Sequence, residues 1–221
     1  TKTEYGEEDE WYYKNSTCAE VYDVSNPAKP KSIGKISQSG SYNTMRVKDG
    51  SVYLLSDYYV TNDAKKKNVS WYVPEVQGKI MDAGDVYMPF DKMGNEYTVI
   101  SSFSLSDPEN KVDSKAVFGY GSICYVSQKN IYITESDYND NDENVTRTAI
   151  RKVSYKDGEL KGVAQTKIKG TLNDSFSIDE YDGNLRVVTT VSDLGGDNGV
   201  MPLFGARSAS SDDAGGRTAR L

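Results

Sequence analysis

The stretch LNDSFSIDEYDGNLRVVTTV, residues 172–191, guides the interpretation of the whole sequence. Its first half alternates apolar residues, Phe176 and Ile178, with polar ones, and a second alternating run follows from Leu185. The Asp-Gly pair at 182–183 separates the two runs and tolerates the positive φ angles of a tight hairpin turn. The stretch therefore predicts a β-hairpin.

The composition favours strands and turns over helices. The 221 residues include 17 Tyr, together with many Ser, Thr, Val, Asp, Asn and Gly. We therefore expect an all-β fold. The formal net charge of -7 argues against a nucleic-acid partner, because phosphate binding needs clustered cations. No apolar run approaches 18 residues, so we predict no transmembrane segment in this chain. The polar, acidic start predicts no signal peptide and indicates an internal fragment.

The reactive side chains limit the possible chemistry. The sequence contains no His, which argues against Ser/His/Asp catalysis, Cys/His catalysis and His-ligated zinc or haem. Its two cysteines, Cys18 and Cys124, lie far apart, and their spacing leaves open whether they pair. The apolar surroundings of Cys124 favour a buried free thiol over a disulfide partner or a nucleophile.

Two kinds of hairpin alternate along the chain. Turns of the first kind fall at Asn26, Asp107 and Asp157, and turns of the second kind fall at Gly50, Asn130 and Gly183. Both series step by about 80 and then about 50 residues, which indicates a four-strand repeat with one insertion, at about 57–96. Such repeats are typical of β-propellers of about four to eight blades, whereas a β-sandwich with coincidental spacing is the alternative. We predict an incomplete β-propeller of four-stranded antiparallel blades, with about three blade-equivalents present.

Several of these stretches resemble a known family. VYDVSNPAKP (residues 21–30), SGSYNTMRVKDGSVYLLS (residues 39–56) and LNDSFSIDEYDGNLRVVTT (residues 172–190) are similar to bacterial secreted β-propeller domain proteins. The resemblance covers about residues 19–190. It implies an extracellular or cell-envelope-attached propeller with no established catalytic residues.

The sequence divides into three regions. Residues 1–18 are an acidic lead-in with a partial strand, and residues 19–191 contain the propeller blades with their insertion. Residues 192–221 are rich in Gly, Ser and Arg and poor in apolar residues, so we expect them to be disordered. This tail is either a non-native end, such as a reading-frame shift would produce, or a natural flexible linker.

The insertion carries aromatic residues that are candidates for ligand binding. Trp71, Tyr72, Tyr87 and Phe90 could form an aromatic platform on one face of the propeller, where loops bind protein or sugar partners. The alternative is that the same side chains pack the insertion onto the blades.

An acidic loop at residues 135–144 is a candidate Ca²⁺ site. Asp137, Asn139 and Asn141 repeat a side-chain oxygen at every second residue, as calcium loops do. However, the loop glycine and the closing bidentate Glu of such loops are both missing, which favours a solvated turn between two successive blades. We expect no other cofactor.

The polar residues of the first stretch are predicted to be structural. Asp179 and Glu180 are adjacent on a strand and therefore point to opposite faces, which does not suit a catalytic carboxylate pair. We expect one of them to form a charge-assisted hydrogen bond with Arg186 or with a neighbouring blade. Gly183 belongs to the hairpin turn.

These observations favour a non-catalytic binding or scaffolding module of the bacterial cell envelope. Its expected partner is a protein or a glycan at the cell surface. The alternative is a carboxylate-dependent hydrolase that acts on extracellular polysaccharide. The sequence leaves open the identity of the ligand, the number of blades in the full protein and the mode of anchoring.

Overall fold

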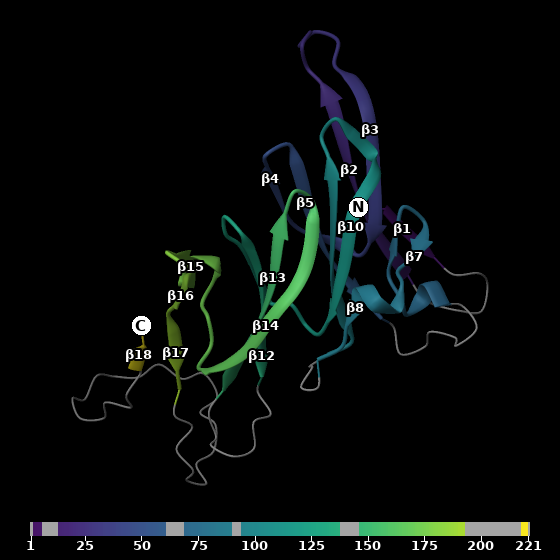
Figure 1. Cartoon of the computed structure of the whole chain (residues 1–221). Coiled ribbons are helices and arrows are strands. Elements are labelled where there is room, and N and C mark those ends of the chain that lie inside the picture. The colour runs from purple at the N-terminus through teal and green to yellow at the C-terminus, as the bar shows by residue number, and fades with distance from the viewer. Residues whose placement is uncertain are drawn as a thin grey trace, which may run out of the picture. The chain divides into compact units, whose positions relative to one another are not determined.

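The protein is described here from a computed structural model that covers residues 2–5, 13–60, 69–89, 94–137, 146–192 and 218–220. These residues form β-strands with three short 3₁₀ helices, and Figure 1 labels most of the strands, which are numbered in chain order. The chain divides into two compact units. One contains Thr1–Glu135 and Ile150–Thr166, and the other contains Ser136–Ala149 and Lys167–Leu221.

The strands form three larger sheets, named sheets A, B and C here. Sheet A has the order β1-β2-β3-β6-β7, with β1 Lys2–Tyr5, β2 Tyr13–Asp23, β3 Lys31–Ser39, β6 Glu75–Val76 and β7 Lys79–Ile80. Sheet B has the order β4-β5-β9-β10-β8, with β4 Ser41–Lys48, β5 Ser51–Tyr59, β9 Glu96–Ser104, β10 Asp107–Phe118 and β8 Val86–Tyr87. Sheet C has the order β11-β12-β13-β14, with β11 Ile123–Val126, β12 Asn130–Asp137, β13 Arg147–Lys156 and β14 Glu159–Lys169.

The second unit also contains two smaller strand pairs. The stretch that opened the sequence analysis forms the hairpin of β15 Ile178–Tyr181 and β16 Asn184–Val187. Its turn has positive φ at Asp182 (49°) and Gly183 (75°), as predicted. Phe176 lies before the hairpin, in η3 Ser175–Ser177, rather than in a strand. The other pair is β17 Thr189–Val191 with β18 Thr218–Arg220.

The predicted four-strand repeat is present, but the hairpins are grouped differently. The sequence analysis joined the hairpin at residues 19–37 with the one at 41–57. In the structure they lie in different sheets, and the hairpin β4–β5 pairs instead with the hairpin β9–β10. The acidic loop at 135–144 therefore connects β12 and β13 of one sheet, rather than two successive blades. Local alternation finds the hairpins, but the pairing between them depends on contacts distant in sequence.

The strands β3, β10 and β14 are each followed by a glycine with a positive φ angle. The glycine N–H donates to a carbonyl at or near the start of the neighbouring strand: Gly40 to Asn15 at 2.7 Å, Gly119 to Glu96 at 2.8 Å and Gly170 to Thr146 at 2.7 Å. At Gly40, where φ is 100°, an added Cβ would lie 2.6 Å from the carbonyl carbon and oxygen of Asp57. The chain can leave the sheet at this point only because no side chain is present.

Two hydrophobic cores fill the spaces beside sheet B. Successive residues of β5 point to opposite faces, so Val52 and Leu54 join the core shared with sheet A, whereas Tyr53 and Leu55 join the core shared with sheet C. All four side chains are buried. Each contributes about 1.5–3 kcal/mol by burial, so a sheet covered on both faces stabilises the fold strongly.

The insertion adds strands to the outer edges of sheets A and B. It contains η1 Val69–Trp71, β6, β7, η2 Ala83–Asp85 and β8. β6 pairs with β3 through Val76 and Gln38, and β8 pairs in parallel with β10. The insertion thereby extends both sheets by short strands.

The ends of the chain differ in part from the predicted regions. β2 begins at Tyr13, so the first blade hairpin starts within the predicted lead-in. Residues 218–220 of the predicted disordered tail form β18, which pairs with β17. The rest of that tail, from residue 193 to 217 and residue 221, lies outside the described residues.

In the part of the chain that the structure covers, no helix has the length and apolar character needed to cross a membrane.

Replacing Gly40 by Ala tests the role of the glycine at the strand end. We expect Gly40→Ala to lower the free energy of unfolding by about 2–4 kcal/mol, because the new Cβ collides with the Asp57 backbone. Gly50→Ala is the matched control, since Gly50 also has a positive φ (77°) but has no atom within 4 Å of an added Cβ. Urea denaturation measures both values. Equal losses in the two variants would contradict the proposed steric role.

Candidate functional site

A polar cleft of about 970 Å³ lies between sheets B and C. Three turns that are distant in sequence lie around it: residues 49–50 between β4 and β5, residues 127–129 between β11 and β12, and residues 157–158 between β13 and β14. Its lining consists of Lys48, Asp49, Ser51, Tyr53, Val112, Asp113, Lys129, Asn130, Ser154, Tyr155, Lys156, Asp157, Glu159, Leu160 and Lys161. The tertiary structure thus brings together residues from six strands and their turns.

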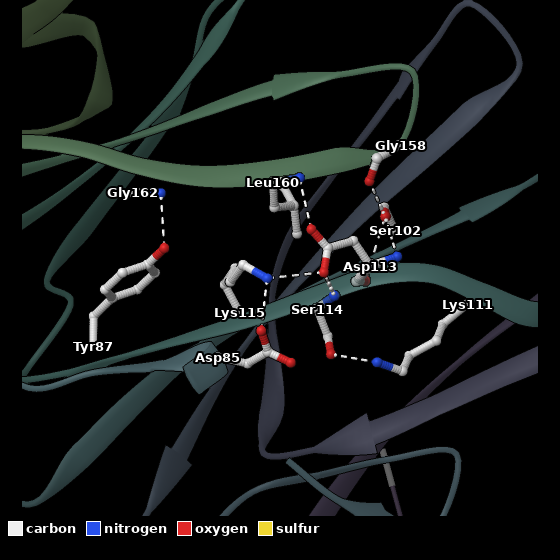
Figure 2. A network of polar contacts seen from close by, with 10 residues as sticks. All are labelled: Asp85, Tyr87, Ser102, Lys111, Asp113, Ser114, Lys115, Gly158, Leu160 and Gly162. Atoms are coloured by element: carbon white, nitrogen blue, oxygen red, sulfur yellow. Dashed lines mark hydrogen bonds and ion pairs between the residues drawn. The ribbon is translucent and has the colours of Figure 1, made fainter. Parts of the chain in front are cut away.

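One wall of the cleft is held by the Asp113 carboxylate (Figure 2). Oδ2 of Asp113 accepts a 2.8 Å hydrogen bond from the Leu160 N–H of sheet C, and Oδ1 accepts one of 3.0 Å from Lys115. Lys115 also donates to Asp85 of the insertion at 2.8 Å. Burial lowers the pKa of Lys115, but the hydrogen bonds to the two carboxylates outweigh it, so the pKa is raised above its ordinary value. Lys115 therefore remains charged and ties the insertion to β10.

The turn between β13 and β14 is held by two side chains of sheet B, Ser102 and Tyr53. The Gly158 carbonyl accepts a hydrogen bond from Ser102, and the Gly158 N–H donates to the Tyr53 hydroxyl at 3.0 Å. The ring of Tyr155 lies against that of Tyr53, with 4.3 Å between the ring centroids. The Lys48 ammonium lies 5.5 Å from the centroid of the Tyr155 ring. These contacts connect the turn to sheet B, and Lys48 also donates to the Gln128 carbonyl.

The charges of the cleft are balanced. Its lining contains four lysines and four carboxylates: Lys48, Lys129, Lys156 and Lys161 with Asp49, Asp113, Asp157 and Glu159. A balanced set of donors and acceptors beside a tyrosine ring suits a polar ligand without strong net charge.

A second, smaller hollow of about 360 Å³ contains two carboxyl groups, Asp57 and Glu96. Asp57 lies opposite Thr98 in the pairing of β5 with β9, so Glu96, two residues before Thr98, lies on the same face. Burial raises the pKa of Asp57, although a 2.7 Å hydrogen bond from Asn43 opposes the shift. Burial and the charge of Asp57 together raise the pKa of Glu96.

Sequence reasoning missed both the cleft and the carboxyl pair. Asp57 and Glu96 were treated as the limits of the insertion, although Asp57 lies within β5 and Glu96 is the first residue of β9. Pairing those two strands across the insertion would have placed the carboxyl groups on one face. No comparable local pattern marks the cleft, because its residues come from three separate turns.

Tyr87, one of the residues of the predicted aromatic platform, makes a packing contact with β14. The Tyr87 hydroxyl accepts a 3.1 Å hydrogen bond from the Gly162 N–H, and a Cβ added at Gly162 would lie 2.8 Å from the Tyr87 ring. Trp71 and Tyr72 lie in and just after η1, which Tyr58 contacts through a hydrogen bond to the Ser70 carbonyl. Phe90 lies outside the described residues.

The structural residues predicted in the β15–β16 hairpin are close together. Arg186 donates to the Asp179 carboxylate, and its guanidinium lies 5.0 Å from the Tyr181 ring centroid. Glu180 is paired with Leu185 in the hairpin register, and Gly183 is in the turn. The hairpin thus brings Asp179 to Arg186, whereas strand alternation directs Glu180 to the other face.

The candidate calcium residues are only partly described. Asp137 accepts a 3.0 Å hydrogen bond from Lys167, and Asn139 and Asn141 lie outside the described residues. Within the described ranges, no group of three or more His, Cys, Asp or Glu side chains is arranged to hold a metal ion. Cys18 and Cys124 are both free thiols, and burial raises the pKa of Cys124 to about 12.

Comparisons with known proteins agree with the architecture. A profile of the family described as the beta propeller domain matches residues 1–215, which includes most of the predicted tail. An uncharacterized protein of Methanocaldococcus jannaschii is 23% identical over 252 aligned positions, which cover 78% of this chain. The chain spans 39% of the length of that relative. The predicted fold class, a β-propeller of four-stranded antiparallel blades, is confirmed.

Replacing Asp57 by Asn tests the electrostatics of the carboxyl pair. Because the folded protein holds the Asp57 proton more tightly than the unfolded chain, the contribution of Asp57 to the free energy of unfolding is largest below the ordinary pKa of 3.8 and falls as the pH rises through the raised pKa. We expect Asp57→Asn to remove part of this fall and to be more stable than the wild type at pH 7. Urea denaturation between pH 3 and pH 8 measures the effect. Parallel pH profiles for the two proteins would contradict it.

Proposed function

Because the chain belongs to the β-propeller domain family, we propose that it is a non-catalytic binding module whose ligand occupies the cleft between sheets B and C. The observation that supports this proposal is a hollow of ligand size with hydrogen-bonded walls and polar groups in its lining. The balanced charge favours a polar ligand of low net charge, and a glycan fits this description best. A protein loop that presents hydroxyl and amide groups is the other class of partner.

We place this binding activity outside the cell or on the cell envelope. This location rests on the resemblance of the repeat to secreted bacterial propellers. A cell-surface location agrees with a glycan ligand, since extended polysaccharides are found there. The chain covers 39% of its relative, so the activity of the whole protein is part of the same proposal.

A carboxylate-dependent hydrolase is the second candidate, and the Asp57 and Glu96 pair supports it better than Asp179 and Glu180 do. The side chains of diagonal neighbours on paired strands lie roughly 7–8 Å apart, which falls within the spacing of about 5–9.5 Å used by glycosidases. A carboxyl group with a raised pKa can serve as the general acid. By contrast, Asp179 is paired with Arg186 and lies on the face opposite to Glu180.

Binding of neutral oligosaccharides tests the proposed function. We expect cellohexaose, chitohexaose or xylohexaose to bind the full chain, as measured by isothermal titration calorimetry. The Lys156→Ala/Lys161→Ala double variant should bind about tenfold more weakly, because it loses rim donors worth about 1.4 kcal/mol. Lys29→Ala/Lys31→Ala is the matched control, since it removes the same charge from exposed positions outside the cleft lining. Equal weakening by both double variants would contradict the cleft as the binding site.

The hydrolase alternative has its own test. Release of reducing sugar from a panel of soluble polysaccharides measures turnover. A hydrolase should lose turnover in Asp57→Asn and in Glu96→Gln, while Asp179→Asn should retain it. Turnover that survives in Asp57→Asn and Glu96→Gln would exclude the pair as the catalytic acid and base.

A further inference from the structure

The outermost strand of sheet C lacks the added strand that sheets A and B have. β3 of sheet A is paired with β6, and β10 of sheet B is paired with β8. β14 is the last strand in the order of sheet C, and no other described strand pairs with its outer edge. An edge of this kind exposes backbone donors and acceptors that can pair with another strand.

Part of this edge is already occupied by side chains of sheet B and the insertion. The Leu160 N–H donates to Asp113 at 2.8 Å, and the Gly162 N–H donates to the Tyr87 hydroxyl at 3.1 Å (Figure 2). Beyond Gly162 the contacts change, because residues 163–166 are all exposed. The free part of the edge therefore begins at Val163.

A groove of about 310 Å³ runs beside this free part of β14. Most of its lining is apolar: Met88, Pro89, Val117, Val153, Val163 and Ala164. The exposed fraction of Val163 is 53%, so an apolar side chain placed in the groove would remove further apolar surface from water. A strand added to β14 would thus find both backbone partners and a place for a side chain.

The connection in sheet C that corresponds to the insertion is too short to cover this edge. In sheet B, the connection from β5 to β9 contains 36 residues (60–95) and supplies β8. The corresponding connection in sheet C, from β12 to β13, contains only nine residues (138–146). To cover the edge, the connection would have to run from β12 to a position beyond β14 and then return to β13. This path crosses roughly five inter-strand spacings, or about 24 Å, whereas nine extended residues reach roughly 30 Å. Too few residues remain to pair along the edge.

The two strands that cover sheets A and B indicate the chemistry of a suitable partner. β6 begins with Glu75, which forms an ion pair with Lys14, and a valine follows it. Asp85, the residue before β8, forms an ion pair with Lys115 at 2.8 Å, and Val86 follows it as the first residue of β8. Among the described residues that line the groove beside β14, none is acidic and two are cationic, Arg151 and Lys152. Arg151 is buried and already forms an ion pair with Glu135, so Lys152 is the cation that a partner carboxylate can reach. An acidic residue followed by an apolar one therefore suits this site as well.

We propose that the β14 edge, at residues 163–166, binds an extended segment of another polypeptide that carries an acidic residue followed by apolar residues. The segment pairs its backbone with β14 and places an apolar side chain in the groove. Backbone pairing supplies the affinity and the groove supplies the specificity, as in other cases of strand addition. This site goes beyond the proposed function, since its lining shares no residue with the polar cleft.

The probe is the synthetic peptide acetyl-AGDVYMP-amide, which has the sequence of residues 83–89. Hydrogen exchange of the full chain, followed by NMR, reports the binding position. We expect the peptide to slow exchange in residues 163–166 of β14. The same peptide with an N-methylated valine, which lacks one backbone donor, and a version with Lys in place of Asp should bind at least about tenfold more weakly.

Val163→Lys tests the groove, because it places a charge at the free edge. We expect it to weaken peptide binding at least about tenfold. Val24→Lys is the matched control, since Val24 is also an exposed valine (63%) and lies outside the groove, and it should bind like the wild type. Thermal melts establish that both variants are folded.

Several results would overturn the proposal. Protection in β10 instead of β14 would mean that the peptide replaces β8. Equal binding of the N-methylated peptide would exclude backbone pairing. Absence of any protection in β14 at saturating peptide, or concentration-dependent pairing of β14 between two copies of the chain, would exclude this class of partner.

Discussion

The glycine crossing that follows β3, β10 and β14 is the constraint on which the repeated sheets depend. At this point the chain must turn sharply while its backbone packs against a neighbouring strand. Gly40 and Gly170 each have backbone atoms 2.6 Å from the position that a Cβ would occupy. Threonine hydroxyls reinforce two of the crossings, since Thr17 donates to the Gly40 carbonyl at 2.8 Å and Thr148 donates to that of Gly170 at 2.7 Å. The crossing therefore repeats as a unit.

The interfaces between neighbouring sheets use different polar groups at equivalent positions. Between sheets A and B, the Gln38 amide donates to Ser56 at 2.7 Å and accepts from Ser101. Between sheets B and C, Val117 takes the place of Gln38, Glu135 that of Ser56 and Arg151 that of Ser101. Glu135 and Arg151 form a buried ion pair at 2.5 Å. Removing either partner of such a pair costs about 3–5 kcal/mol, because a charge remains buried and unpaired. The polar contacts of Gln38 between sheets A and B involve uncharged side chains, whereas those between sheets B and C involve an ion pair. Equivalent positions in the repeat therefore accept different polar side chains.

Sequence reasoning succeeded where the signal is local. Alternation and turn chemistry predicted the all-β class, the hairpins and the positive φ at Asp182 and Gly183. It failed where a choice depends on residues distant in sequence. The hairpins at 19–37 and 41–57 were grouped together, although Gly40 directs the chain from one sheet into the next. Tyr87 shows the same limit at the candidate site, since its contact is Gly162, 75 residues away.

The sequence by itself determined which segments become strands and where they turn, because strand alternation and the backbone preferences of Gly, Asp and Asn act over a few residues. Only the tertiary structure decided which hairpins share a sheet. It also placed Asp57 beside Glu96, gathered the cleft from three turns and left the β14 edge without a partner among the described strands. The reason is physical: backbone pairing is nearly independent of sequence, so the partner of each strand is selected by the burial of whole sheet faces and by the length of the connections between them.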